Sequence, residues 1–256
     1  MKILDVLTSP WAISPEKMLE IRNLYQAHLR GPKIDWKQME ARVGIVPAGE
    51  SKEQALYQVM GGVAVIPVKG VLTKGLSFFS FLFGGASMKQ VGIAFQTALD
   101  DPDVKSILLD VDSPGGTVDG TEELAEAIFE ARGRKPTVAY TDGTMASGAY
   151  WIASAADEIY ISGDTVLMGS IGVVATHIDQ SRADEQYGEK WTEITAGKYK
   201  RIASSHAPLT DEGKAYIQEQ VDYLYSTFVN SIARNRGAAP EKSLAMADGR
   251  IFIGKQ

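Results

Sequence analysis

Residues 137–156 constrain the fold of this chain more than any other stretch. A short apolar strand, Thr137 to Tyr140, runs into small residues, then into Ser147, and then into a helix-forming run from Ala149 to Ala156. A serine between a strand end and a helix start has an exposed hydroxyl and neighbouring backbone N–H groups without partners. This geometry is typical of an activated nucleophile beside an oxyanion hole. It also suits a serine that only caps the helix, which is the commoner case, so both interpretations stay open at this point.

The chain from Gly62 onward repeats this alternation of strand and helix. Strands are expected at 63–68, 70–72, 106–111, 158–162, 171–176 and 191–195, and helices at 87–100, 121–132, 180–187 and 211–236. Such an alternation favours an α/β fold with a mainly parallel sheet. The last helix is roughly 40 Å long at 1.5 Å per residue. A helix of that length usually projects beyond its own domain, which indicates a contact with a partner subunit.

Residues 1–60 are expected to form a helical leader, distinct from a main domain over 61–256. Ser14-Pro15 has the pattern of a helix N-cap followed by the first helical position, and Gly31-Pro32 ends the helix at about Arg30. Shorter helices are predicted over 35–43 and 52–58. Nothing in the leader carries chemistry, and it could pack on the core, on a neighbouring subunit or on another protein.

Composition and charge argue against several classes of protein. The net charge is −6 and there is no block of Lys or Arg, so a nucleic-acid footprint is not expected. The absence of Cys excludes disulfides, thiol nucleophiles and thiolate metal sites, and the three histidines have no metal-ligand spacing. We therefore expect no cofactor and no metal.

The hydrophobic segments do not predict stable membrane insertion. Asp5 interrupts the apolar run of the N-terminus, which therefore does not resemble a signal peptide. The most apolar stretch, 76–83, is too short to span a bilayer. Its four phenylalanines suit a core or subunit contact, the wall of an apolar substrate groove, or a membrane-surface contact. A cytoplasmic location is expected.

Two glycine-containing turns lie at the ends of neighbouring strand–helix units. Ser113-Pro114-Gly115-Gly116 follows one strand, and Ser147-Gly148 follows the next. Proline fixes one φ angle, while glycine allows conformations that other residues resist, so such a turn can aim N–H groups at an anion. The turn could also be only a tight connection, and a phosphate loop fits poorly because no Gly-Lys-Ser/Thr follows.

Four motifs in order resemble the signal peptide peptidase A (SppA) family of serine proteases, which includes phage prohead proteases related to the lambda C protein. The motifs are DVDSPGGTVDG, TDGTMASGAYWIASAADEIYISGDTVLMGSIGVV, ITAGKYKRIAS and ADGRIFIGKQ, and the similarity covers about residues 62–256. The resemblance implies a ClpP/crotonase-like fold, a spiral of ββα units assembled into oligomeric rings. The leader looks more like that of the phage-type members.

The same resemblance implies a Ser–Lys dyad. The family nucleophile falls on Ser147 and the family lysine on Lys200, with Lys198 as the competitor two positions away. A lysine acts as a base only when neutral, so burial or a nearby positive charge must lower its pKa. The backbone N–H groups of Gly115 or Gly116 and of Gly148 are the expected oxyanion donors. A dyad needs neither His177 nor His206, although a ClpP-like His–Asp pair would require one of them.

Double-length family members take the serine and the lysine from different repeats, whereas this chain holds one repeat. We therefore expect Ser147 of one subunit to meet Lys200 of its neighbour in a homo-oligomer. Family members usually continue past the DGRIFIGKQ stretch, so a truncated C-terminus is a further expectation.

The expected function is a serine endopeptidase acting on polypeptides, with phage capsid maturation, on a scaffold or portal protein, as the leading role. An SppA-like peptidase for signal peptides or misfolded chains is the alternative. From other classes, a crotonase-like acyl-CoA enzyme and an inactive scaffold ring stay open.

Overall fold

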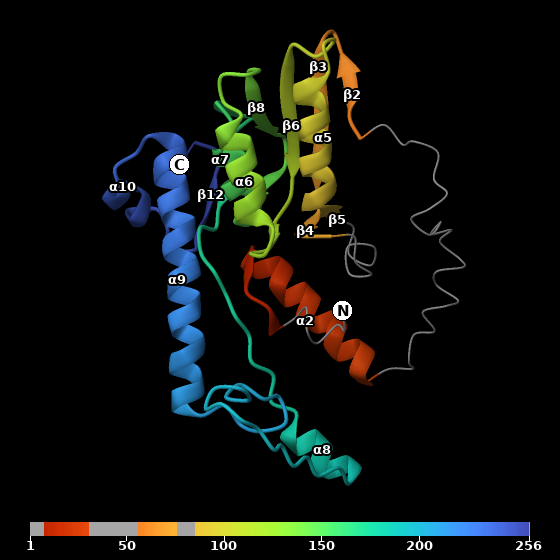
Figure 1. The fold of residues 1–256 in the computed structure, drawn as a ribbon, viewed down its shortest axis with the longest axis vertical. Coiled ribbons are helices and arrows are strands. Elements are labelled where there is room, and N and C mark those ends of the chain that lie inside the picture. Colours follow the sequence, from red (N-terminus) through yellow and green to blue (C-terminus); the bar gives the residue numbers. More distant parts are fainter. Residues whose placement is uncertain (1–7, 31–55, 76–84, 256) are drawn as a thin grey trace, which may run out of the picture.

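The computed structural model describes residues 8–30, 56–75 and 85–255. Its main sheet has the order β10-β8-β6-β3-β2 (Figure 1). The first four of these strands run parallel, and β2 pairs antiparallel at the edge. The strands are β3 (Val63–Lys69), β6 (Ser106–Asp112), β8 (Thr137–Thr141), β10 (Glu158–Ile161) and β2 (Gln58–Met60). The predicted α/β class with a mainly parallel sheet is confirmed.

Three helices pack beside this sheet: α5 (Met88–Asp100), α6 (Thr121–Glu130) and α7 (Gly148–Ser154). Ser87 caps α5 as predicted, because its side chain accepts a hydrogen bond from the backbone N–H of Gln90 at 3.3 Å. Alternate residues of β6 are buried, and they join the apolar faces of α5 and α6 in one core. That core fixes the ends of the strands from which the glycine turns emerge.

Short strands form two further sheets at one end of the main sheet. One has the order β1-β7-β4-β5 and the other β12-β11-β9. Their bounds are β1 (Trp11–Ile13), β4 (Val71–Thr73), β5 (Gly85–Ser87), β7 (Gly115–Thr117), β9 (Thr144–Ala146), β11 (Leu167–Gly169) and β12 (Ile251–Ile253). Along the chain, a long strand, one or two short strands and a helix follow one another in each of three units, which end in α5, α6 and α7. The spiral arrangement itself stays a prediction.

After residue 174 the chain extends away from the sheets and then runs back to them. Residues 175–210, here called the arm, include α8 (Ser181–Tyr187) and extend away from the sheets; α9 (Asp211–Arg236) runs back along the molecule to α10 (Pro240–Ala245) (Figure 1). Near its C-terminal end α9 packs on α7, where Phe228 stacks on Trp151 with ring centroids 4.4 Å apart. The predicted bounds of this long helix are confirmed.

The N-terminal segment packs on the main body of the protein. Helix α2 (Pro15–Arg30) follows β1, as the Ser-Pro signal predicted. Its buried side chains form a small cluster separate from the main core: Trp11, Ile13, Met18, Ile21 and Val71. Strand β1 was not predicted, because three residues between two prolines carry no periodic signal of their own.

Two predicted strands are wrong. The stretch 171–176 makes only an isolated bridge at Val174, and the strand lies earlier, at β11. Gly169 and Ser170 both have positive φ angles, 96° and 53°, which turn the chain away from the extended path. Residues 191–195 pair with no sheet edge and lie exposed in the arm.

The predicted helix over 35–43 and the aromatic stretch 76–83 lie outside the described residues, and Gln58, predicted helical, begins β2.

Candidate active site

Ser147 occupies a strained position between β9 and α7. Its φ and ψ angles are 53° and −121°, a combination that costs a residue with a side chain about 1–3 kcal/mol. The position is held from both sides: the Ser147 N–H donates to the Gly169 carbonyl at 2.7 Å, and the Ser147 carbonyl accepts from the Trp151 N–H at 2.9 Å. A sharp turn of this kind between strand and helix presents a serine hydroxyl away from its own backbone.

The hydroxyl of Ser147 does not cap the helix. No backbone N–H of α7 donates to it, and it is buried without any hydrogen-bond partner among the described residues. An unpaired buried hydroxyl is unfavourable, so it calls for an explanation beyond local stability. The capping interpretation that the sequence left open is therefore wrong for this conformation.

The turn after β6 lies directly beside the turn that carries Ser147. Ser113 bridges to Met145 of β9, with the Ser113 N–H donating to the Thr144 carbonyl at 2.7 Å. The carboxylate of Asp112 accepts a hydrogen bond from the Thr144 N–H at 3.0 Å. The two glycine-containing turns recognised in the sequence are thus joined in space.

The three predicted oxyanion residues lie together around this junction. A Cβ on Gly115, whose φ is 99°, would lie 2.9 Å from the Gly148 nitrogen. Gly148 begins α7, so its N–H belongs to those that a helix leaves without an intrahelical partner. The Gly115 N–H donates to the Ser113 hydroxyl at 3.2 Å, and Gly116 lies opposite Ala12 of β1. In this conformation two of the three residues are therefore engaged by other groups.

Lys200 lies on an exposed turn of the arm and does not contact Ser147 within this chain. Its neighbours pack against the first half of α9: Lys198 pairs with Glu212, and Tyr199 stacks on Tyr216. Ser147, by contrast, precedes Trp151, which packs on Phe228. Glu212 and Phe228 are separated by about 24 Å along the helix at 1.5 Å per residue.

Lys198 is held in a form unsuited to a base. The Glu212 carboxylate accepts a hydrogen bond from the Lys198 ammonium and thereby raises the pKa of that ammonium. A raised pKa keeps the amine protonated, whereas a general base must be neutral. This contact favours Lys200 over Lys198 as the base.

His177 and His206 both belong to the arm. The His206 Nδ1 atom lies 2.8 Å from a carboxylate oxygen of Asp184, and its ring stacks on Trp191. The His177 Nε2 atom lies 3.0 Å from the Ser204 carbonyl. The His206–Asp184 pair has the form of a catalytic pair, but nothing within the described chain brings the Ser147 hydroxyl to it. Across the described ranges, no group of three or more His, Cys, Asp or Glu side chains could hold a metal ion.

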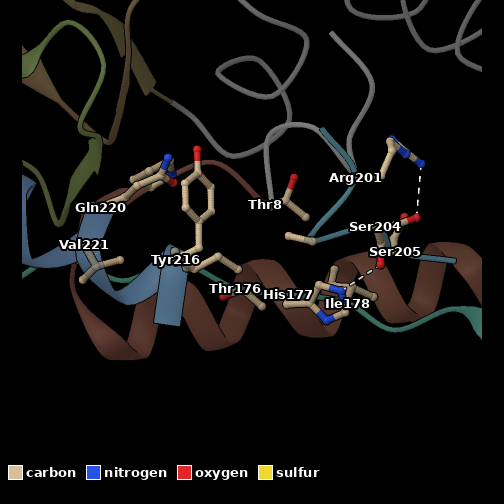
Figure 2. Close-up of a pocket in the computed structure, with 14 residues that line it drawn as sticks. Thr8, Thr176, His177, Ile178, Arg201, Ser204, Ser205, Tyr216, Gln220 and Val221 are labelled. Atoms are coloured by element: carbon tan, nitrogen blue, oxygen red, sulfur yellow. Dashed lines mark hydrogen bonds between the residues drawn. The ribbon is translucent and has the colours of Figure 1, made fainter. Parts of the chain in front are cut away.

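A cavity of about 340 Å³ separates the arm from α9 and from the residues before β1 (Figure 2). Arg201, Ser204 and His177 provide polar groups on one wall, and Val221 of α9 lies on another. The Arg201 guanidinium donates to the Ser204 hydroxyl at 3.2 Å. The cavity therefore lies next to the turn that holds Lys200.

Comparison with known proteins shows which family this chain resembles. The sequence profile described as peptidase family S49 matches residues 130–256, a range that contains both Ser147 and Lys200. Over these residues the chain resembles peptidase family S49. The resemblance to the SppA proteases drawn from the motifs is confirmed.

Several known proteins are similar to this chain over a wider range than the profile match. A putative protease of Methanocaldococcus jannaschii is 39% identical over 155 residues, which are 60% of this chain and 50% of the relative. The capsid assembly protease C of Escherichia phage lambda is 32% identical over 200 residues, 78% of this chain and 45% of the relative. A putative signal peptide peptidase SppA of Enterococcus faecium is 34% identical over 159 residues, 61% and 46% of the two chains. The chain spans about half the length of these relatives.

No helix within the described ranges is long and apolar enough to cross a membrane. The sequence interpretation gave no role to Asp112 or Ser113, which join the two turns, or to Ala12, which lies against the predicted oxyanion glycines. Two polar residues directly after a buried strand could have indicated the first pair. No local signal marks Ala12.

Proposed function

We propose that this chain is a serine endopeptidase that uses a Ser–Lys dyad. The observation that carries the proposal is the strained backbone of Ser147, whose buried hydroxyl has no hydrogen-bond partner among the described residues. This serine lies beside two glycine-containing turns and within the residues that match the S49 profile. Lys200 would take the proton from the Ser147 hydroxyl as its oxygen attacks a peptide carbonyl. The proton then passes to the leaving amine, and water hydrolyses the acyl-enzyme.

The lysine is proposed to come from a neighbouring copy of the chain. Support comes from the exposed turn that holds Lys200 and from the length of α9 between that turn and the α7 contact. Exposed apolar side chains on the arm and on α9 suit a contact between subunits, among them Tyr187, Trp191, Ile194 and Tyr223. A homo-oligomeric ring and a ClpP/crotonase-like spiral are part of the proposal. The strand–strand–helix order around α5, α6 and α7 supports the spiral.

The backbone N–H groups of Gly148 and of Gly115 or Gly116 are proposed to stabilise the oxyanion. Removing one such donor typically costs about 2.7–4 kcal/mol of transition-state stabilisation. Gly148 is the donor best supported by its position at the start of α7. The donor from the other turn requires a rearrangement in which a substrate carbonyl replaces the present partners.

We further propose phage capsid maturation as the biological role, with a scaffold or portal protein as substrate. The similarity to the lambda capsid assembly protease, over 200 residues, supports this role. An SppA-like peptidase that digests signal peptides or misfolded chains is the second candidate.

Cleavage of an unfolded protein by mixed variants tests the dyad. Ser147→Ala and Lys200→Ala are each expected to be inactive, and refolding the two together is expected to restore part of the activity. Lys198→Ala and His206→Ala are the matched controls and are expected to remain active. A mixture that stays inactive would place both residues in one chain, and an active Lys200→Ala variant would refute the assigned base. Binding of coenzyme A instead of proteolysis would favour a crotonase-like enzyme.

A further inference from the structure

Strand β1 is inserted between two other segments near Ser147. On one side the Trp11 N–H donates to the Val174 carbonyl and the Trp11 carbonyl accepts from the Val174 N–H, both at 2.9 Å. On the other side the Ser14 N–H donates to the Pro114 carbonyl at 2.8 Å, and the Val118 N–H donates to the Pro10 carbonyl at 3.2 Å. The backbone of β1 is therefore held along both edges, as an added strand is held by a sheet.

The centre of this strand lies against the predicted oxyanion residues. In an antiparallel ladder every second residue pair is hydrogen-bonded. Since the pairs Ser14–Pro114 and Pro10–Val118 are hydrogen-bonded, the pair between them, Ala12–Gly116, is also a hydrogen-bonded pair. A Cβ on Gly115 would overlap the Ala12 carbonyl oxygen, and a Cβ on Gly148 would lie 3.1 Å from it. The Ala12 carbonyl is thus surrounded by Gly115, Gly116 and Gly148.

Ser147 is closed to solvent in the same conformation. Its exposed fraction is 0%, and those of Trp11 and Ala12 are also 0%. A peptidase nucleophile must reach the carbonyl of an extended substrate. Here the edge of β7 that such a substrate would use already carries a strand of the protein's own chain.

We propose that the slot between β7 and Val174 is the binding site for an extended peptide substrate, and that β1 occupies it and blocks the enzyme until it is displaced. This inference rests on the proposed endopeptidase function and adds to it a substrate site and its regulation. The substrate residue at the position of Ala12 lies with its carbonyl toward the oxyanion glycines.

The contacts of β1 also indicate what the slot accepts. Recognition through the main chain tolerates many sequences, which suits an enzyme that acts on polypeptides. Ala12 packs into the main core among glycines that leave little room, so a small residue is expected at its position. Trp11 and Ile13 point to the opposite face and fill the small cluster with α2, so bulky apolar residues are expected at the flanking positions.

The segment that would move is separable from the rest of the fold. Trp11 and Ile13 pack with α2 in a cluster separate from the main core, Ala12 is the one residue of β1 in that core, and β1 lies at the edge of its sheet. Thr8 and Pro10, just before β1, line the cavity beside the Lys200 turn (Figure 2). The residues just before β1 therefore connect the slot to the cavity wall, so displacement of β1 would also alter that wall.

Peptide binding to the full chain carrying Ser147→Ala tests the slot without depending on catalysis. The probe is a fluorescent peptide with the sequence of residues 8–14, measured by anisotropy. Trp11→Ala loosens β1 while leaving the slot residues unchanged, and Ile21→Ala, at a residue 1% exposed, loosens α2 instead. Each is expected to tighten peptide binding about tenfold or more, because a larger fraction of the protein is open. Leu19→Ala, at a residue 55% exposed on α2, is the matched control and should not change binding.

Cleavage of an unfolded protein by the same variants with Ser147 intact separates this inference from the proposed function. Tighter binding together with faster cleavage supports both. If the loosened variants bind the peptide more tightly but no variant cleaves protein, the proposed peptide-binding slot stands and the proposed endopeptidase function is refuted. The inference is overturned if both loosened variants keep a native circular dichroism spectrum yet bind the peptide no more tightly than the Ser147→Ala protein in which β1 and α2 are unchanged. In that case β1 is a permanent strand of the fold.

Discussion

Phe228 is expected to determine whether α9 stays attached to the helix that follows the nucleophile. Its ring is 0% exposed and stacks on Trp151 at 4.4 Å with an interplanar angle of 9°. Replacing it with alanine leaves a cavity against Trp151, and such a change in a core typically costs about 3–5 kcal/mol, of which the aromatic pair accounts for about 0.5–1.5 kcal/mol. With a urea m value of about 3 kcal/mol/M, the midpoint should fall by roughly 1 M or more.

Urea denaturation followed by circular dichroism measures this loss. Tyr223→Ala is the matched control, because Tyr223 lies on the same helix but is 72% exposed, and it should change the free energy of unfolding by about 0.5 kcal/mol or less. Phe228→Leu keeps most of the buried volume and should fall between the two. A loss below about 1 kcal/mol for Phe228→Ala would refute the reasoning, since it would mean that the ring does not fix α9 on α7.

Three further predictions concern the two turns and the arm. Ser113→Ala removes both hydrogen bonds of a buried hydroxyl, and the free energy of unfolding should fall by about 1–3 kcal/mol in urea. Gly116→Ala would force a Cβ into a neighbouring backbone carbonyl and should abolish the native circular dichroism spectrum, whereas Gly75→Ala, with open space around it, should not. Hydrogen bonding from Arg201 lowers the pKa of Glu193, so its stabilisation is present above the usual glutamate pKa of about 4.3 and is lost as the pH falls through the lowered value. Amide exchange of residues 191–206, corrected for intrinsic rates, should increase below about pH 4, and Glu193→Gln should remove that pH dependence.

The elements predicted best from the sequence are those with long, strongly periodic patterns. The helix over 211–236 has its bounds as predicted because a threonine caps its start and Gly237, with φ 57°, ends it. The strand at 171–176 was misplaced because apolar residues alone do not show that two positive φ angles precede it. The segment 191–195 has the composition of a strand, but no sheet edge is available to it in the arm.

The sequence by itself determined the α/β class, the serine at the strand–helix turn and the motifs that resemble the SppA family, since these depend on local periodicity and on short runs of residues. The tertiary structure decided which groups meet: the Asp112 and Ser113 contacts that join the two turns, the pairing of Lys198 with Glu212, and the position of β1 against Gly116. These contacts link residues far apart in the chain, and no local pattern encodes them. A three-residue strand in particular forms only because two separate edges supply its hydrogen bonds, so its place becomes visible only when the whole chain is folded.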